Sequence, residues 1–480
     1  MTSERPVVVV AGASGFVGQS LGPALRERFH AIGLSRSARE PGGGYDAWRA
    51  ADLFSLLEAE RALEGADVAV YLVHSMMPRA GLTQARFEDL DLVCADNFAR
   101  AAAKTRVRRI VYLGGLIAEH AAPLSRHLES RLEVERALGA HGVPVTTLRA
   151  GLIVGAGGSS FDMLFRLVER LPAMILPAWT ATRTHPIALE DVVRLLAFAI
   201  ARDELAGRTF DVGGPDVMTY REMLETTADV LGVRRWFVSV PLFTPGLSRL
   251  WVTLVTGAPR ELVAPLVQSL RHEMVARDRA LQDLAGVPGV PFREALRGAI
   301  DRGRAAPPRR ARAHAPSPRR VRSVQRLELP AGRDALWAAH EYFRWLPRAF
   351  RPFLVVDVTP DAEHARISIP VLGISLLELT LSRERSTPDR PLLYITGGAL
   401  SGDDGRGRLE LRQLPGSRTL LAAVHDFIPR LPWFVYRYTQ ALAHLYVMAR
   451  FDRHLRALGE VAPVRAPSPR VDHSGAGAGS

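Results

Sequence analysis

The sequence has almost no cysteine and almost no lysine. Cys94 is the only cysteine among 480 residues, which excludes an intrachain disulfide and a four-cysteine zinc site. Lys104 is the only lysine, and it does not follow a phosphate-binding loop of the Walker type. The sequence also lacks a Gly-x-Ser-x-Gly elbow and a His-x-x-x-His pair, so serine hydrolases and metal enzymes are disfavoured. We expect no bound metal.

Long hydrophobic runs are absent as well. Stretches such as residues 250–258 stop short of the ~18 apolar residues that a membrane-spanning helix needs. Residues 1–4 lead directly into the apolar segment 7–11 without a sequence typical of a secretory leader. With 47% hydrophobic and 23% charged residues, the chain has the composition of a globular protein of two or more domains. We therefore expect a cytoplasmic protein without a transmembrane segment.

The net charge of +12 is concentrated in one segment. Arginine supplies 61 of the 62 basic residues, a skew that GC-rich coding explains better than selection for nucleic acid. Residues 301–323 hold eight arginines against Asp301, together with four prolines. This pattern predicts a solvated linker between domains, with weak binding to an anionic membrane surface or RNA as the alternative. No specific nucleic-acid site is expected, and residues 461–480 resemble a flexible tail.

The first three hundred residues alternate apolar strands with amphipathic helices. The expected strands are continuous apolar runs, as in a parallel sheet covered on both faces; they are 7–11, 30–35, 68–73, 109–113 and 143–149. The helices between them are 53–63, 87–105 and 129–141. This order predicts a doubly wound α/β Rossmann domain over residues 1–300. Residues 151–300 should form a substrate lobe with helices at 189–201 and 220–231.

Residues 324–460 predict a second, α+β domain. A strand at 322–329 and a helix at 334–350 come first, and a single long helix at 433–458 ends the domain. Between them, turn-forming residues separate six short strands, at 353–358, 365–369, 376–382, 392–397, 408–413 and 419–427. One long helix across a curved antiparallel sheet is common in domains that contain a cavity.

The strongest motif is a glycine-rich turn after the first strand. Residues 7–18 read Val-Val-Val-Val-Ala-Gly-Ala-Ser-Gly-Phe-Val-Gly, with Gly12 in the tight turn and Gly15 where backbone amides approach a pyrophosphate. Gly18 permits close packing of a helix that we expect to start near it, and the helix N-terminus favours an anion. A glycine turn without a ligand is the alternative. We predict a dinucleotide site that includes Ser14, Phe16 and Val17.

The end of the second strand indicates which dinucleotide binds. NAD enzymes usually place an acid here, whereas this chain has Ser35 and Arg36, with Arg39 close behind. A guanidinium beside a hydroxyl suits the 2′-phosphate of NADP(H), because the contact is charge-assisted. The alternative is an ordinary surface arginine. We expect NADPH to be preferred over NADH.

Residues 7–200 resemble the atypical short-chain dehydrogenase/reductases, in particular the NmrA-like NAD(P)H-binding branch. The resemblance rests on consecutive motifs in order, namely Gly12-x-x-Gly15-x-x-Gly18, Asp52-Leu53, residues 70–76 (Val-Tyr-Leu-Val-His-Ser-Met), 111–115 (Val-Tyr-Leu-Gly-Gly), 148–151 (Leu-Arg-Ala-Gly) and Pro186-Ile187-x-x-x-Asp191-Val192. The resemblance implies that Asp52 and Leu53 lie beside the adenine. It also implies that the ribose and nicotinamide contact the segments containing His74, Ser75, Gly114, Gly115 and Gly151.

The chain departs from the family at its catalytic pair. Active members use Tyr-x-x-x-Lys, in which the tyrosine is the general acid/base and the lysine lowers its pKa. Alignment on Glu135-x-x-Leu138 places these two positions at His127 and Arg131. His127 could exchange a proton, whereas Arg131 could only anchor ribose or phosphate. The alternative is that both residues are structural or face solvent.

The residues expected around the nicotinamide are mostly apolar. They are Met76, Met77, Ser159, Ser160, Phe161, Met163, Trp179 and His185. Such a pocket suits a small hydrophobic or quinone-like ligand better than a sugar nucleotide, although each residue could instead belong to the core. In the second domain, the order of elements resembles the START-like helix-grip fold. The aromatic residues of its last helix would pack on the sheet or line a lipophilic cavity.

Two functions remain open from the sequence. The first is an NADP(H)-dependent oxidoreductase that acts on a hydrophobic carbonyl, enone or quinone-like substrate with an unconventional acid. The second is a non-catalytic NADP(H)-binding sensor or assembly factor, which the missing Tyr-x-x-x-Lys pair favours. We prefer the enzyme narrowly.

Overall fold

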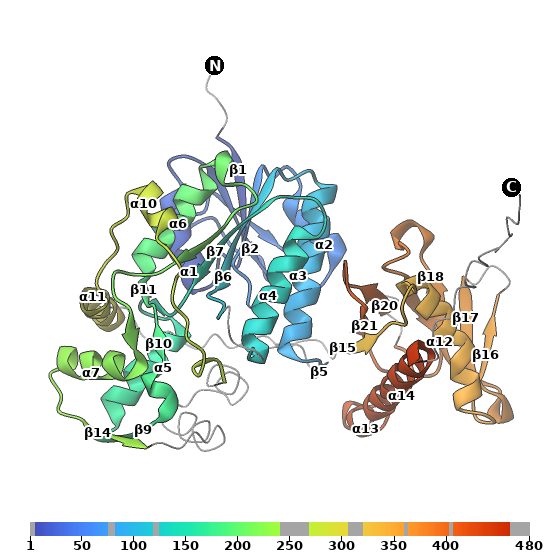
Figure 1. Cartoon of the computed structure of the whole chain (residues 1–480). Helices are drawn as coiled ribbons and strands as arrows, with labels where there is room; N and C mark the ends of the chain where they lie inside the picture. The colour runs from blue at the N-terminus through green and yellow to red at the C-terminus, as the bar shows by residue number, and fades with distance from the viewer. Residues whose placement is uncertain are drawn as a thin grey trace, which may run out of the picture. The chain divides into compact units, whose positions relative to one another are not determined.

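The computed structural model of the chain describes residues 5–74, 82–118, 124–240, 268–305, 320–359, 363–402 and 407–460. The chain divides into two compact units (Figure 1). The first unit comprises Met1–Arg79 and Arg86–Pro316. The second comprises Ser317–Ser480 together with the short segment Ala80–Ala85. Within the described residues, no helix combines the length and the apolar character needed to cross a bilayer.

The first unit is built on a seven-stranded parallel sheet in the order β12-β7-β6-β4-β1-β2-β3. Its strands are β1 (Val7–Ala11), β2 (His30–Ser35), β3 (Ala47–Ala50), β4 (Val68–Tyr71), β6 (Arg109–Gly115), β7 (Val145–Ala150) and β12 (Thr209–Val212). The chain order reverses between β1 and β4, which is the switch point where open α/β sheets bind ligands. The predicted doubly wound Rossmann fold is confirmed.

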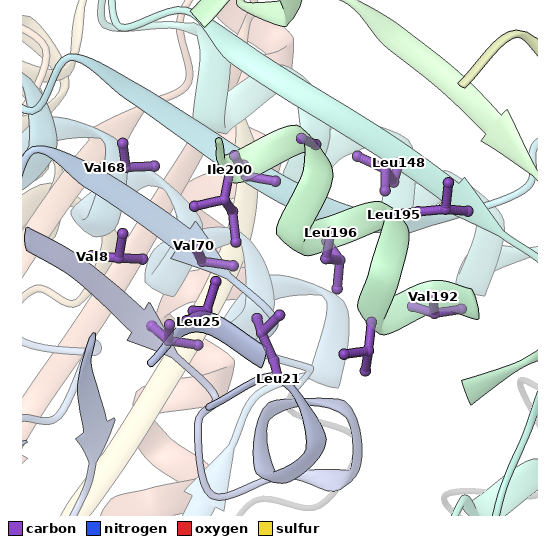
Figure 2. Close-up of a cluster of buried hydrophobic side chains, with 14 of the residues drawn as sticks. Val8, Leu21, Leu25, Val68, Val70, Leu148, Val192, Leu195, Leu196 and Ile200 are labelled. Atoms are coloured by element: carbon purple, nitrogen blue, oxygen red, sulfur yellow. The ribbon is translucent and has the colours of Figure 1, made fainter. Parts of the chain in front are cut away.

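Helices cover both faces of this sheet. Figure 2 shows α1 (Phe16–Leu25) and α6 (Leu189–Ile200) on one face, where Leu21 and Leu196 meet Val8 and Val70. Helices α2 (Leu56–Leu63), α3 (Phe87–Lys104) and α4 (Arg126–Gly139) form the other layer (Figure 1). Because both faces are covered, the inner residues of β1 are fully buried, which explains its uninterrupted run of valines.

The remaining elements of the first unit form a lobe with its own hydrophobic core. Its helices are α5 (Ser159–Arg170), α7 (Tyr220–Leu231), α10 (Ala280–Ala285) and α11 (Phe292–Ala305), of which α10 contacts the sheet layer. Short strand pairs join β8 (Ile153–Val154) to β11 (Ile187–Ala188), β9 (Ala173–Pro177) to β14 (Trp236–Val240), and β10 (Arg183–Thr184) to β13 (Met218–Thr219). Helix α7 begins with a capping box between Thr219 and Glu222, which stabilises its first turn. Sequence reasoning did not foresee α5 and α11.

The second unit contains an eight-stranded sheet in the order β16-β17-β18-β19-β20-β21-β15-β5. Its elements are β15 (Val321–Glu328), α12 (Ala335–Ala349), β16 (Val355–Val358), β17 (His364–Ile369), β18 (Ile374–Leu381), β19 (Leu392–Gly397), β20 (Arg408–Gln413), β21 (Thr419–Phe427), α13 (Trp433–Tyr438) and α14 (Gln440–Glu460). The predicted separate sheet with a closing helix is confirmed, while the START-like assignment stays a prediction. Helices α12 and α14 meet through Tyr342, Trp345 and Phe451.

Two features of this unit differ from expectation. The single predicted helix over 433–458 is two helices, because Thr439 ends α13 with φ −124° and ψ −85°. The Thr439 hydroxyl donates to the carbonyl of Val435, a local bond that competes with helix continuation. The other difference is β5 (Leu82–Gln84), which adds a parallel edge strand to β15 from far away in the sequence.

The predicted linker at residues 301–323 overlaps the ends of two elements. Helix α11 continues to Ala305, and β15 begins at Val321. Residues 306–319 and the predicted tail at 461–480 lie outside the described residues.

Candidate functional site

The glycine-rich turn lies at the carboxyl end of β1, at the switch point of the sheet. Gly12 has φ +87°, and a Cβ there would lie 2.9 Å from the carbonyl of Leu72. The amide of Gly15 donates to the Gly12 carbonyl at 2.8 Å and closes the turn. Helix α1 begins at Phe16, two residues before the expected start near Gly18. A Cβ at Gly18 would overlap the Gly12 carbonyl, so Gly18 does allow close packing.

The structure shows the contacts of the other residues predicted in this turn, Ser14, Phe16 and Val17. The carbonyl of Ser14 accepts a hydrogen bond from Gln19 at 2.8 Å, and Val17 packs against the core. The ring of Phe16 lies so close to Gly155 and Gly158 that a Cβ at either glycine would be 2.9 Å from it. Because no side chain caps the first turn of α1, the amides of that turn are available for an anion.

The end of β2 places a hydroxyl among arginines. Ser35 is buried, Arg36 is exposed, and Arg39 donates to the Ser35 hydroxyl at 3.2 Å. The Arg39 guanidinium also stacks over Trp48, with 5.0 Å to the ring centroid. Two cationic side chains at the end of the second strand fit the recognition of a phosphate on the adenosine ribose.

The residues predicted beside the adenine follow β3. The side chain of Asp52 accepts from the amide of Phe54 at 3.1 Å, which orders the turn before α2. Leu53 is buried, and its carbonyl accepts from Asn97 of α3 at 2.9 Å. Both residues therefore lie near the carboxyl edge of the sheet, on the β3 side of the glycine turn.

A polar cluster lies at the carboxyl edge on the other side of the turn. Asp91 of α3 is fully buried, and its Oδ2 is 2.9 Å from Arg131 Nη2 and 2.8 Å from His74 Nδ1. Because a carboxylate only accepts hydrogen bonds, His74 Nδ1 carries the proton in this contact. The rings of His74 and His127 lie 5.2 Å apart. The structure thus places His127 next to His74, which shares the Asp91 carboxylate with Arg131.

The electrostatics of this cluster keep both histidines neutral. Burial lowers the pKa of His127 to about 3, with further contributions from His74 and Arg131. Loss of hydration and the Arg131 charge also lower the pKa of His74, although Asp91 opposes this shift. Despite its burial, Arg131 has a raised pKa because Tyr112 and Asp91 lie near it. Asp91 and Arg131 therefore form a buried ion pair, beside which His127 is uncharged at neutral pH.

An apolar cavity of about 200 Å³ adjoins this cluster. His127, Gly115 and Gly151 belong to its wall, so it opens onto the carboxyl edge of the sheet. Its other described lining residues come mainly from the lobe and are mostly aliphatic or aromatic: Leu116, Leu128, Ala150, Leu152, Ser160, Met163, Leu164, Leu167, Ile175, Leu176, Pro177, Trp179, Thr180, Tyr220, Leu224, Ser269, Leu270 and Met274. Polar groups are few here, so the cavity is suited to a hydrophobic ligand.

The buried Nδ1 of His127 has no hydrogen-bond partner among the described residues. Leaving such an atom unpaired costs about 1–3 kcal/mol, so a bound group with a polar atom would relieve this cost. This orphaned atom and the glycine cradle at residues 12–18 fit a nicotinamide dinucleotide with a polar substrate group beside it.

The pocket residues expected from the sequence separate into three groups. Ser160, Met163 and Trp179 line the cavity, whereas Phe161 lies in the core of the lobe and Ser159 is not among the lining residues. His185 is not in the cavity wall: its Nε2 donates to the Gly214 carbonyl at 2.8 Å, and its Nδ1 accepts from Ala276. It is a structural residue that joins two loops. Ser75, Met76 and Met77 lie outside the described residues.

Packing requires glycine at two of the three positions predicted near the nicotinamide, Gly114 and Gly151. A Cβ at Gly114 would lie 2.9 Å from the ring of Tyr112, and one at Gly151 would lie 2.7 Å from the His185 carbonyl. Gly115 faces the Arg131 side chain at an ordinary distance of 3.6 Å.

Sequence reasoning missed Asp91, Tyr220 and Ser269. Asp91 lies on a buried stretch of α3, and a carboxylate amid apolar residues on a helix was the available signal. Ser269 lines the cavity, and its hydroxyl is 2.8 Å from that of Ser125, the N-cap of α4. Nothing in the local sequence indicates that contact. No group of potential metal ligands occurs in the described part of the chain.

Comparisons with known proteins give partial matches. No family model matches the chain. It is 29% identical over 145 residues to the Auxiliary protein GraX of Staphylococcus aureus, covering 30% of this chain and 43% of that protein. It is 26% identical over 216 residues to NADH dehydrogenase [ubiquinone] 1 alpha subcomplex subunit 9, mitochondrial, of Arabidopsis thaliana, covering 42% of this chain and 53% of that protein. The chain thus spans about half the length of these two relatives.

A third relative is covered more fully. Ceramide reductase of Caulobacter vibrioides is 29% identical over 260 residues, which cover 51% of this chain and 76% of that protein.

Two solved structures share the fold of the first unit. A nucleoside-diphosphate-sugar epimerase from Staphylococcus aureus matches at a TM-score of 0.50 and 16% identity, covering 61% of this chain and 99% of that one. The triphenylmethane reductase of Citrobacter sp. matches at a TM-score of 0.50 and 18% identity, covering 62% of this chain and 99% of that one. About three-fifths of the chain therefore has the Rossmann-type fold of these epimerase and reductase structures.

Proposed function

We propose that the first unit is an NADP(H)-dependent oxidoreductase of the atypical short-chain dehydrogenase/reductase type. Its substrate would be a small or medium hydrophobic carbonyl, enone or quinone-like compound. The observation that carries this proposal is the apolar cavity, which has His127 and Gly115 in its wall and adjoins the carboxyl edge of the sheet. Hydride from bound NADPH is the chemistry that the cofactor supplies at this edge.

The residues that would hold the cofactor lie in three places. The turn at residues 12–18 and the N-terminus of α1 would bind the pyrophosphate, because the first turn of α1 has no side-chain cap and the glycines leave room. Ser35 and Arg36, with Arg39 beside them, would bind the 2′-phosphate, and Asp52 with Leu53 would border the adenine. This arrangement supports NADPH over NADH.

His127 would act on the substrate as a neutral hydrogen-bond donor. With a pKa of about 3, it carries no spare proton at neutral pH and is a poor general acid. A neutral imidazole can nevertheless polarise a carbonyl by donating a hydrogen bond, and His127 belongs to a largely apolar wall. Arg131 would position His127 and His74 through Asp91 and would not transfer a proton.

The choice of a hydrophobic substrate over a sugar nucleotide follows from the cavity wall. Sugar hydroxyls need several hydrogen-bond partners, and the polar side chains among the described residues of this wall are those of Ser160, Thr180, Tyr220, Ser269, His127 and Trp179. The relative named ceramide reductase has a lipid in its name, which agrees with a hydrophobic substrate.

A second candidate function is a non-catalytic NADP(H)-binding sensor or assembly factor. The polar cluster around Asp91 favours it. The lysine position is Arg131, which is locked in a buried ion pair with Asp91. The names of two relatives, an auxiliary protein and a subunit of NADH dehydrogenase, are compatible with such a role. The second unit would then present a ligand or partner; its order of elements supports a START-like fold with a lipophilic ligand.

One experiment separates the two functions. Calorimetric titrations with NADPH, NADP⁺, NADH and NAD⁺ come first, followed by an NADPH-oxidation screen against quinones, enones and aldehydes. NADPH binding with turnover of at least one compound supports the enzyme. Binding without any turnover favours the sensor or assembly factor, and the absence of cofactor binding contradicts both.

A further inference from the structure

The second unit exposes an apolar surface at one end of its sheet. Four side chains there are largely open to solvent: Phe353 (70% exposed), Val371 (85%), Phe434 (70%) and Tyr438 (68%). Leu442 and Tyr446 continue the surface along α14, four and eight residues after Tyr438. Exposed aromatic and aliphatic side chains gathered in one place mark an interaction site.

The strand register brings these residues to the same end of the unit. Phe353 lies two residues before Val355, the first residue of β16, and Val355 pairs with Ser368 near the end of β17. Val371 lies at the tip of the hairpin that joins β17 to β18, in the 3₁₀ helix Pro370–Leu372.

Hydrogen bonds connect this hairpin to the last helices. The amide of Leu400 donates to Leu376 of β18, and the amide of Arg430 donates to the carbonyl of Leu400. The chain then enters α13, which carries Phe434. On the other side, Phe350 at the end of α12 contacts Tyr446 of α14, with 6.4 Å between ring centroids. These contacts place the hairpin and the end of α12 in the same part of the second unit as α13 and α14.

Arginines border the part of this surface formed by α13 and α14, whereas β16 carries the exposed acid Asp357, four residues after Phe353. Residues 428–451 contain Arg430, Arg437 and Arg450 but no Asp or Glu, and residues 345–356 are likewise free of acids. Arg437 lies over the ring of Tyr438 at 5.7 Å, and Arg450 lies over Tyr446 at 5.9 Å. Within the described part of the chain, Arg437 and Arg450 form no ion pair, so both charges are available to a partner.

We propose that this surface docks the protein onto an anionic lipid bilayer. Aromatic rings with arginines beside them are typical of protein segments at the membrane interface, where rings enter the acyl boundary and guanidiniums meet lipid phosphates. The protruding Val371 tip suits shallow insertion. A second copy of the chain is a poorer occupant, because a symmetric contact would bring the arginines of both copies together.

The test uses the full-length chain and sedimentation with vesicles. One vesicle population is phosphatidylcholine alone, and the other contains about one-third phosphatidylglycerol. The proposal predicts binding to the anionic vesicles that weakens as salt rises, and much weaker binding to phosphatidylcholine. The double variant Arg437→Gln/Arg450→Gln should lower the partition coefficient about fivefold per arginine. Phe434→Ser combined with Tyr438→Ser should lower it by at least about tenfold.

Matched variants in the first unit control for general charge and hydrophobicity. Leu284→Ser removes an exposed leucine from α10, and Arg136→Gln removes an exposed arginine from α4; both should bind like the unmodified chain. Circular dichroism checks that each variant is folded.

Several outcomes overturn the proposal. Absence of binding to anionic vesicles means that another partner covers the surface, such as an acidic protein or another part of the chain. Equal losses in the control variants indicate binding through net charge alone. Loss of binding only when the arginines at 302–322 are replaced by glutamine places the contact in the predicted linker. A dimer that the Phe434→Ser/Tyr438→Ser variant dissociates indicates self-association.

Discussion

Asp91 of α3 and Arg131 of α4 form a buried ion pair, with 2.9 Å between Oδ2 and Nη2. The pair joins α3 to α4 at the carboxyl edge of the sheet. Because the same oxygen also accepts from His74, one carboxylate orients two side chains of the candidate site. The ion pair therefore contributes to both the stability and the geometry of the site.

Replacing Asp91 with Asn should lower the free energy of unfolding by about 3–5 kcal/mol. The change leaves the buried Arg131 guanidinium without its counter-charge, and an uncompensated buried charge is strongly destabilising. Urea unfolding followed by circular dichroism measures the effect. The matched control is Glu225→Gln, which breaks the exposed Arg221–Glu225 pair and should cost less than about 0.5 kcal/mol. Similar costs for both variants would contradict the buried pair.

The His127→Phe variant should resist acid better than the unmodified chain. Since burial lowers the pKa of His127 from 6.5 to about 3, the unfolded chain binds a proton at this residue more readily than the folded chain between these values. The stability contribution of a neutral His127 is thus complete above pH 6.5 and is lost as the pH falls toward 3, at up to about 1.4 kcal/mol per pH unit. Phenylalanine removes that loss.

Urea unfolding of both proteins at pH 7, 6, 5 and 4 checks this difference. Parallel curves of stability against pH for the two proteins would show that His127 is hydrated in the folded chain. The same variant tests the mechanism: once a substrate is known, an unchanged single-turnover rate of NADPH oxidation removes His127 from it.

Arg36→Ala should weaken NADPH binding by about 1–3 kcal/mol, the cost of a charge-assisted contact, while NADH binding changes little. Arg39→Ala should also weaken NADPH binding more than NADH binding, but by less than Arg36→Ala does. The guanidinium of Arg39 already contacts Ser35 and Trp48, so it contributes less to a bound phosphate. Arg28→Ala, an exposed arginine after α1, serves as the control. Calorimetric titration with both cofactors measures the difference, and equal losses for the two cofactors reject the NADP assignment.

Gly12→Ala should destabilise the protein and abolish dinucleotide binding. The new Cβ would meet the Leu72 carbonyl at 2.9 Å in a residue with φ +87°, which combines a clash with backbone strain. Gly65→Ala is the matched control, since Gly65 has φ +72° but open space around its Cβ position. We expect the control to lose about 1 kcal/mol and Gly12→Ala to lose more. Thermal unfolding with and without NADPH compares them.

Ser160→Phe should fill part of the apolar cavity without touching the glycine turn. The proposed function predicts unchanged NADPH affinity and a loss of turnover with any active quinone, enone or aldehyde, because the substrate would be excluded. Ser159→Phe, at the neighbouring position outside the lining residues, is the control. Full activity of Ser160→Phe would mean that the substrate binds elsewhere.

Local patterns in the sequence determined most of the elements and the glycine-rich turn. Continuous apolar runs at 7–11 and 30–35 match β1 and β2, and the boundaries of β19, β20 and β21 match the expected ones. These segments can be predicted from the sequence because burial imposes a pattern on neighbouring residues. The turn at 12–18 can be predicted because its backbone conformation and close packing require glycine. The family resemblance singled out His127 and Arg131, and their roles stay predictions.

Tertiary structure alone decided which distant residues meet. Asp91 pairs with Arg131 forty positions later, Ser125 meets Ser269, and β5 joins β15 across more than two hundred residues. His185 was expected in the pocket but joins two loops, and the predicted helix at 433–458 breaks at Thr439. Contacts of this kind depend on how separate elements pack, and packing leaves no periodic signal within either segment. The sequence therefore determined the elements and the glycine-rich turn, and the folded chain decided the cavity and the charges beside it.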